Sequence, residues 1–279
     1  MNTQPDLVSL RPVAFFVTVC IAITLGSPIA RAGLTAQDTF DYAAGALNAK
    51  NGGTGWNGAW SSPSGATIST TSITYNFGGT VLGGGNSLKI TNGANPLQRD
   101  VFAAPDTSGQ DYYVSFIFQN TGTTFVGVQA KDNNVSVTND TIGLINNGAV
   151  GARVGNTTST ASTSFADGIT HFFVIQYTGW DGSTYRTANI WLNPTTGGEG
   201  ANSISATYTG TVNQGSSGFV GLYIRTVISA TDGTQWMYVD DLRVGTDWAS
   251  VTAIPEPGFS AIIAGFTVCL LAIVKRRDR

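Results

Sequence analysis

Short runs rich in Val, Ile, Phe, Tyr and Trp, separated by Gly, Ser, Thr and Asn, recur along most of this 279-residue chain. The apolar types favour pleated strands, whereas the small polar residues between them favour turns. Helix formers are scarce, because residues 33–253 hold one Glu and three Lys. The best helix candidate there, residues 41–49, is spoiled by Gly45. This segment is therefore predicted to be all-β, with no helix.

The run from Asp111 to Gln119 (DYYVSFIFQ) shows the period-2 alternation expected of a strand. Its even-numbered residues 112–118 would lie on one face and residues 113, 115 and 117 on the other. About a dozen such runs are predicted strands: 66–77, 87–91, 98–103, 111–119, 124–130, 141–145, 150–154, 171–177, 187–192, 219–224 and 236–244. Their number favours an antiparallel jelly-roll sandwich. No fixed repeat is visible, which argues against a propeller.

The N-terminal 32 residues have the pattern of a signal peptide. An apolar stretch from Val13 to Leu25 follows Arg11, and the small residues Ala30 and Ala32 form an A-x-A pattern. Cleavage after Ala32 is expected. An uncleaved N-terminal anchor is the alternative.

The C-terminus contains a second membrane-directed segment. The 16 apolar or small residues from Phe259 to Val274 would rise about 24 Å as a helix, close to the ~30 Å hydrocarbon core. The basic residues Lys275, Arg276, Arg277 and Arg279 follow, which places this end in the cytoplasm and the preceding chain outside. Just before the span, the triplet Pro255, Glu256 and Pro257 cannot continue a helix.

The triplet, span and basic cluster together (residues 255–279) resemble the PEP-CTERM sorting signal of Gram-negative bacteria. The resemblance implies that a membrane enzyme called exosortase reads the tail and trims it. It also implies export across the inner membrane, transient anchoring there, and delivery to the cell envelope or extracellular matrix. A plain C-terminal anchor with an incidental proline-rich neck is the alternative. Residues 248–254 would form the linker to this tail.

The segment between the two ends has a composition that excludes several classes of protein. Both cysteines, Cys20 and Cys269, lie outside it, so it has no disulfide framework. Residues 33–253 carry eight Lys and Arg against 14 Asp and Glu, a net charge of about −6 with no basic stripe. Nucleic acid is therefore not an expected partner.

The body from about Asp38 to Asp247 resembles exported domains of the concanavalin-like and laminin-G-like type. The residues that carry this resemblance are the segments FDYAAG (40–45), GGTGW (52–56), Trp60 and YVDDLRVGT (238–246). It implies a β-sandwich domain over residues 33–247 whose first and last strands pair, which would bring Phe40 close to Leu242.

Candidate catalytic residues are few. A retaining glycosidase needs two carboxyl groups about 5 Å apart, but this segment has one glutamate, Glu199. Asp240 and Asp241 are adjacent on a predicted strand and are expected to point to opposite faces. His171 is the sole histidine, and no G-x-S-x-G elbow occurs. A non-catalytic protein is predicted, with a glycan-active hydrolase or lyase using Asp240 and His171 as the alternative.

No cofactor is predicted, although calcium has candidate ligands in Asp132, Asp140, Asp240 and Asp241. Such residues also simply make turns. Tryptophans in Gly-rich contexts, Trp56, Trp60 and Trp180, are candidate glycan contacts, with a core role as the alternative for the first two.

These observations predict an exported envelope or matrix protein that associates with extracellular polysaccharide. A purely structural or adhesive matrix component remains the other non-catalytic alternative.

Overall fold

The structure is a computed structural model. It describes residues 33–62, 65–91, 97–104, 106–121, 125–131, 141–146, 149–154, 157–164, 168–182, 185–195, 198–201, 203–207, 218–227 and 236–252. The predicted signal peptide (1–32) and the sorting tail with its basic cluster (255–279) lie outside these residues. Within the described part of the chain, no helix is long and apolar enough to span a bilayer.

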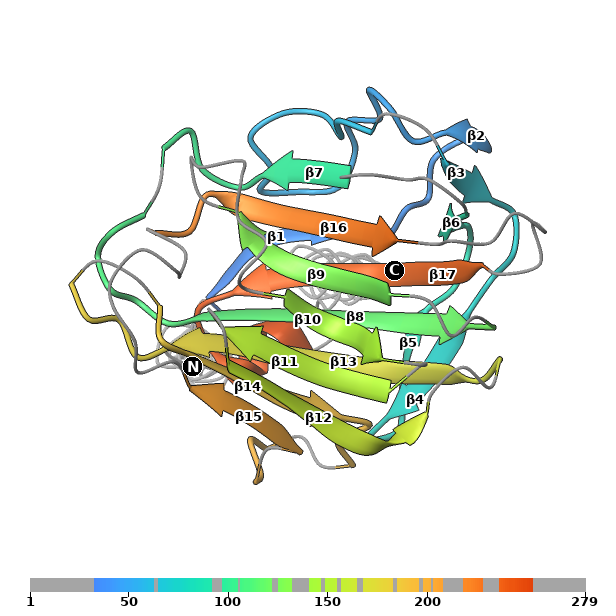
Figure 1. Ribbon diagram of the computed structural model, residues 1–279. Helices are drawn as coiled ribbons and strands as arrows, with labels where there is room; N and C mark the ends of the chain where they lie inside the picture. The colour runs from blue at the N-terminus through green and yellow to red at the C-terminus, as the bar shows by residue number, and fades with distance from the viewer. Residues whose placement is uncertain are drawn as a thin grey trace, which may run out of the picture. The chain divides into compact units, whose positions relative to one another are not determined.

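Most of the described strands form two antiparallel sheets (Figure 1). The larger has nine strands: β1 (Leu34–Asp38), β2 (Gly45–Ala46), β3 (Ala66–Ser69), β6 (Ser87–Ile90), β8 (Tyr112–Asn120), β13 (Thr170–Thr178), β14 (Thr187–Leu192), β15 (Ile204–Thr207) and β17 (Met237–Gly245). Their order is β15-β14-β13-β8-β17-β6-β3-β2, and β1 also pairs with β17. The strand nearest the C-terminus thus lies inside the sheet.

The second sheet has six strands: β7 (Leu97–Asp100), β9 (Phe125–Lys131), β10 (Thr141–Asn146), β11 (Ala149–Val154), β12 (Thr157–Ser164) and β16 (Gly221–Val227). Their order is β12-β11-β10-β9-β16-β7, so the consecutive strands β9 to β12 form a meander. This sheet lies in front of the nine-stranded sheet in Figure 1.

The main hydrophobic core lies between the two sheets and uses one face of each strand. On β8, Tyr112, Val114, Phe116 and Phe118 belong to this core, which confirms the predicted alternation. On β16 the core residues are Leu222 and Ile224, both fully buried. Burying one such side chain contributes about 1.5–3 kcal/mol. The two sheets are therefore held together as a sandwich by apolar packing.

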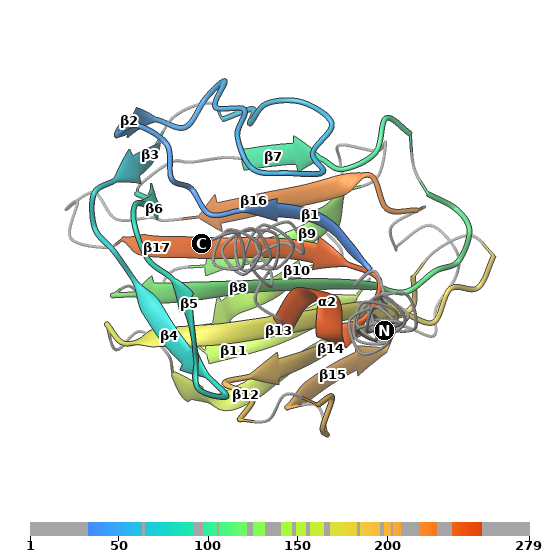
Figure 2. The same cartoon turned by 180° about the vertical axis from the view of Figure 1, so that it is seen from behind.

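A smaller hydrophobic cluster covers part of the outer face of the nine-stranded sheet. The hairpin of β4 (Thr74–Phe77) and β5 (Thr80–Gly83) and the short helix α2 (Trp248–Thr252) pack on this face, as Figure 2 shows. The expectation of no helix was wrong at α2, which occupies the predicted linker. The Asp247 side chain caps it by accepting a 2.7 Å hydrogen bond from the Ser250 N–H.

Two expectations about strand boundaries had different outcomes. The first and last strands pair as predicted, with Asp38 opposite Leu242. The predicted single strand 66–77 was wrong, because the chain leaves the sheet after Ser69 and re-forms as β4 in the outer hairpin. Residues 41–49 contain β2 and no helix.

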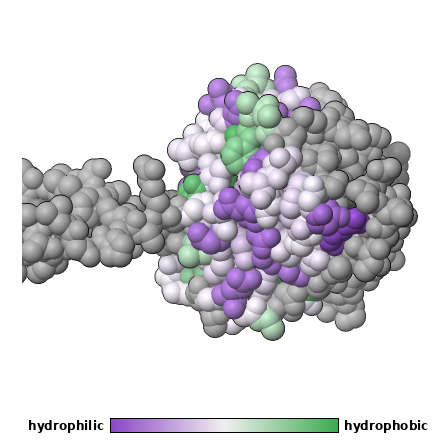
Figure 3. Space-filling view, turned by 90° about the vertical axis from the view of Figure 1, so that its left-hand side faces the viewer, coloured by the Kyte–Doolittle hydropathy of each residue, from purple (hydrophilic) through white to green (hydrophobic). Residues whose placement is uncertain are grey.

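The described surface is mixed in polarity. On the side drawn in Figure 3, the coloured residues are mainly hydrophilic or neutral, and the hydrophobic ones form small separate areas. Val81 and Ile169, 61% and 60% exposed, are the large hydrophobic residues that stand out on the described surface. Scattered apolar residues of this kind are normal on a folded protein.

Candidate functional site

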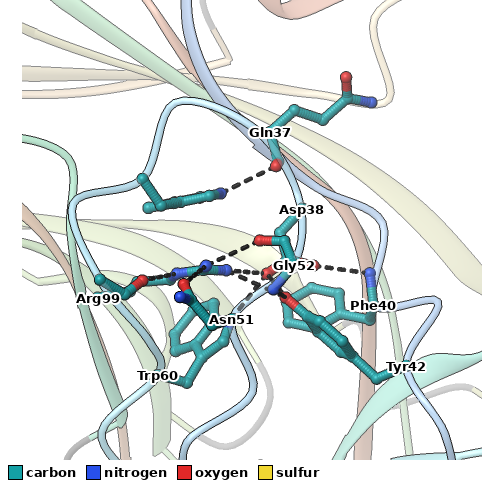
Figure 4. A network of polar contacts seen from close by, with 10 residues as sticks. Gln37, Asp38, Phe40, Tyr42, Asn51, Gly52, Trp60 and Arg99 are labelled. Atoms are coloured by element: carbon teal, nitrogen blue, oxygen red, sulfur yellow. Dashed lines mark hydrogen bonds and ion pairs between the residues drawn. The ribbon is translucent and has the colours of Figure 1, made fainter.

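The segment around residues 38–60 is held by a buried ion pair (Figure 4). Arg99, on the core side of β7, donates to the Asp38 carboxylate at 2.5 Å, and both side chains are 1% exposed. The same guanidinium donates to the carbonyls of Gly52 at 2.8 Å and Gly58 at 3.0 Å. Arg99 therefore ties β1 and the following loop to the six-stranded sheet.

Trp56 and Trp60 belong to this buried network. Trp60 is 1% exposed and donates from its indole N–H to Asp38 at 2.8 Å. Trp56 is half-buried and donates to the Gln37 carbonyl at 2.9 Å. The Arg99 guanidinium carbon lies 4.9 Å and 5.6 Å from the two ring centroids. Trp60 is thus a core residue and presents no ring face to a glycan.

Burial also changes the chemistry of Tyr42, whose hydroxyl donates to Asp38 at 2.6 Å. Burial and this hydrogen bond to a carboxylate raise the pKa of Tyr42 to about 12. Its phenol therefore stays protonated at neutral pH and acts as a hydrogen-bond donor within the network.

Trp180, the third candidate glycan contact, follows β13 on the chain. Its ring is half-buried, with its centroid 5.0 Å from that of Tyr185. A side chain on Gly109 would collide with this ring, since an added Cβ would lie 2.7 Å from it. Trp180 packs against the core and keeps part of its surface exposed.

Asp240 and Asp241 do not point to opposite faces of β17, so that prediction was wrong. The register shifts between Asp240 and Arg243, and Asp241 adopts φ of 50°. Such a bulge inserts one extra residue, which interrupts the alternation of faces. Val239 and Leu242 both enter the main core, and the two carboxyl groups between them lie on the outer side of the sheet.

These two carboxyl groups are buried and occupied by N–H donors. Asp240 accepts from the backbone N–H of Gly84 at 3.1 Å and of Asp241 at 2.7 Å. Asp241 accepts from Arg243 twice, at 2.9 Å each, and from Gln37 at 3.2 Å. Burial is the main cause that raises the pKa of Asp240 to about 8, and the nearby Asp241 charge adds to it.

Calcium is bound by several oxygen ligands that face the ion. The oxygens of Asp240 and Asp241 face N–H donors instead, so this arrangement does not fit calcium. Among the described residues, no group of three or more His, Cys, Asp or Glu is placed to hold a metal ion. The other two calcium candidates, Asp132 and Asp140, lie outside the described residues.

His171 and Asp240 lie on opposite faces of the nine-stranded sheet. His171 pairs with Phe118, which faces the main core, and its ring centroid is 5.4 Å from that of Phe118. Asp240 pairs with Ile117, which faces the outer cluster. The two groups that the enzyme alternative requires are therefore not brought together.

Glu199 also has a local structural contact. Both of its carboxylate oxygens lie 3.2 Å from the Tyr113 hydroxyl on the outer face of β8. Gln176 donates to the same hydroxyl at 2.9 Å and to Asp111 at 3.0 Å. The contact fastens the segment between β14 and β15 to the sheet.

The outer face of the six-stranded sheet contains a feature that the sequence reading missed. In the register of the strands, Gly127 of β9 pairs with Gly143 of β10, and Gly143 pairs with Gly151 of β11. Val128 of β9, next to Gly127, enters the main core. Successive residues of a strand alternate faces, so the three glycines form a row on the outer face.

Other residues flank this glycine row at register positions of the same face. Next to Gly127 in the row stands Arg225 of β16, and next to Gly151 stands Thr160 of β12. The adjacent row contains three register pairs: Gln98 with Tyr223, Tyr223 with Gln129, and Thr141 with Arg153.

A further row on this face contains an ion pair. Gly221 lies between Asp100 and Lys131 in the register, and those two residues form an ion pair. The Lys131 ammonium lies 5.8 Å from the Tyr223 ring centroid. The face therefore combines polar and charged positions with a row of glycines, and Gly151, Gly221 and Tyr223 on it are buried.

Comparisons with known proteins give fold-level likeness only. No protein-family model matches the chain, and no curated protein matches its sequence. Among solved structures, it is similar to an endo-β-1,4-glucuronan lyase from the fungus Trichoderma reesei, at 15% identity and a TM-score of 0.42, covering 71% of this chain and 94% of that one.

The chain is also similar to a receptor-binding domain of botulinum neurotoxin C/D mosaic serotype, at 9% identity and a TM-score of 0.44. This match covers 77% of the chain and 48% of that domain, so the chain spans about half the length of the toxin structure.

Proposed function

We propose that this chain is an exported, non-catalytic protein with a concanavalin-like jelly-roll body. It binds an extracellular polysaccharide on the outer face of its six-stranded sheet. The observation that carries this proposal is the row formed by Gly127, Gly143 and Gly151. The candidate partner is identified by chemistry only: a chain of sugar rings with apolar faces and hydroxyl edges.

The glycine row lowers the stability of the strands, so its presence needs an explanation other than strand stability. A glycine inside a strand destabilises it by roughly 0.5–1 kcal/mol relative to alanine, so three cost about 1.5–3 kcal/mol. Glycine at such positions often marks the close approach of a ligand or another backbone. With strands about 4.8 Å apart, the three glycines span about 10 Å between the outer two strands. An extended ligand lying across the strands fits a strip of this kind.

The flanking rows supply the polar contacts that such a ligand needs. The half-buried Gln98 offers hydrogen-bonding groups for hydroxyls, and the partly exposed ion pair of Asp100 with Lys131 adds charged groups on the same face. The placement of His171 and Asp240 on opposite faces of the other sheet supports a non-catalytic role.

The proposal includes delivery by the two ends of the chain. Residues 1–32 act as a signal peptide cleaved after Ala32, and the tail from Pro255 to Arg279 is read by an exosortase-type enzyme. Replacing Pro255, Glu256 and Pro257 by alanine should leave the protein in the inner membrane with its tail intact. Unchanged tail removal in that variant would contradict this part of the proposal.

Glycan binding is tested with the purified exported chain on a panel of neutral and acidic polysaccharides. Gly143→Leu places a branched side chain in the glycine row and should weaken binding at least tenfold without unfolding the protein. Thr67→Leu, on an exposed position of β3 in the other sheet, is the matched control and should bind as the wild type does. Equal binding by Gly143→Leu and wild type would refute the assigned face.

The enzyme alternative has its own assay on the same panel. New reducing ends would indicate hydrolysis, and absorbance of unsaturated products would indicate elimination. Either activity, if lost in Asp240→Asn or His171→Ala, would replace the non-catalytic proposal.

A further inference from the structure

The two ends of the described body meet at one corner. The Gly33 backbone N–H donates to Asp247 at 3.3 Å, and the Gly33 carbonyl accepts from the Thr246 N–H at 3.0 Å. This contact follows from the pairing of β1 with β17. Both membrane-directed segments of the sequence are therefore attached at neighbouring points, one before Gly33 and the other after α2.

Helix α2 is firmly packed at this corner. The Trp248 ring packs edge-to-face on Trp191 with centroids 5.2 Å apart, and Val251 is 1% exposed. Ser115 of β8 donates from its hydroxyl to the Val251 carbonyl at 2.6 Å. The last described residue, Thr252, is 5% exposed. The chain is thus fixed to the nine-stranded sheet until the point where the tail begins.

The sequence leaves little chain between this fixed point and the apolar span. Pro255 follows Thr252 by three residues and Phe259 follows it by seven. At no more than about 3.5 Å per residue, these distances are at most ~10 Å and ~25 Å. The headgroup layer on one side of a bilayer is itself about 5–8 Å thick.

We propose that the corner formed by Gly33, Asp247 and α2 is a surface that contacts a lipid bilayer while the tail is in place. This rests on the membrane-directed tail of the proposed function. The short connection keeps α2 next to the headgroups. Since α2 packs on the outer face of the nine-stranded sheet, the six-stranded sheet with its glycine row is turned away from the membrane.

A second feature lies on the same face of the sheet. The β4–β5 hairpin packs on the same outer cluster as α2 (Figure 2), and Val81 on it is 61% exposed. Val81 stands on this side of the molecule, but a single exposed aliphatic residue does not by itself mark a contact surface. The opposite orientation would press the glycan-binding face against the membrane.

The orientation is testable with two single-cysteine variants of the full chain. Cys20 and Cys269 are first changed to serine. Ala249→Cys then labels an exposed position on α2, and Gln98→Cys labels the outer face of the six-stranded sheet. Each fluorophore-labelled protein is reconstituted in phosphatidylethanolamine–phosphatidylglycerol vesicles that contain a lipid with a headgroup quencher.

Quenching should be at least threefold stronger at Ala249→Cys than at Gln98→Cys. Inserting a 20-residue Gly/Ser linker after Thr252 should reduce this ratio toward one, because the body is then free to turn. Equal quenching without the linker, in protein that floats with the vesicles, would overturn the inference and leave the proposed function intact. Protein that does not associate with vesicles at all would contradict the membrane-directed tail itself.

Discussion

The guanidinium of Arg99 and the carboxylate of Asp38 are 2.5 Å apart and almost completely excluded from solvent. They come from strands in different sheets, β7 and β1. The pair therefore joins the two layers at the edge where the Gly-rich loop of residues 51–58 closes. This explains why the sequence there is rich in tryptophan: Trp56 and Trp60 shield the ion pair from water.

Removal of one partner should be strongly destabilising. Arg99→Met leaves the Asp38 charge buried without its ion-pair partner, which costs about 3–5 kcal/mol. Arg186→Met is the matched control, because its ion pair with Asp181 is partly exposed and such pairs contribute at most ~1 kcal/mol. Urea denaturation monitored by tryptophan fluorescence measures both. A loss below 1 kcal/mol for Arg99→Met would contradict a structural role for the pair.

Asp240 should give the protein a pH-dependent stability in the window between about pH 4 and pH 8. Its pKa is raised to about 8 in the folded state, against about 3.9 for an unperturbed aspartate. The folded state therefore binds a proton that the unfolded state has lost. The stabilising contribution is complete below pH 4 and is lost as pH rises through 8.

Asp240→Asn removes this titration. Between pH 4 and pH 8, the unfolding free energy of the wild type should fall by roughly 2–5 kcal/mol relative to that of the variant. Chemical denaturation at a series of pH values measures it. A difference that does not change with pH would show that Asp240 has an ordinary pKa.

Trp248→Ala should release α2 from the body. The substitution removes the ring that packs on Trp191, and loss of a buried tryptophan costs about 3–5 kcal/mol. The helix has only five residues and lies at the end of the described body, so the expected effect is local: limited proteolysis cuts within residues 246–252 before the sandwich unfolds. Ala249→Ser, at an exposed position of the same helix, should remain resistant. Equal resistance of the two variants would mean that Trp248 does not anchor the helix.

The alternation of side chains along β8, β13 and β14 was sufficient to predict which residues share a face, because these strands pair with each other in long, unbroken registers. It did not predict which face enters the main core, since β8 and β13 have apolar residues on both faces. Strand β12 (TTSTASTS) was missed because its sequence has no alternation of apolar and polar residues. Its extended conformation depends instead on its pairing with β11.

The site features that were missed depend on pairing between distant residues. A bulge at Asp240–Asp241 cannot be read from a run of alternating residues, and it reversed the expectation for the two carboxyl groups. The glycine row depends on the pairing of β9, β10 and β11, which the spacing of the glycines along the sequence does not determine.

The pairing of β1 with β17 also determines when this protein can fold. Leu34 lies opposite Gly245, so the strand inside the large sheet is supplied by nearly the last described part of the chain. Contacts between residues so far apart in sequence form slowly, since a long loop must close first. During synthesis, the nine-stranded sheet cannot be completed until β17 emerges. Until then, the roughly 200 residues between β1 and β17 lack the strand that pairs with β1, β6 and β8.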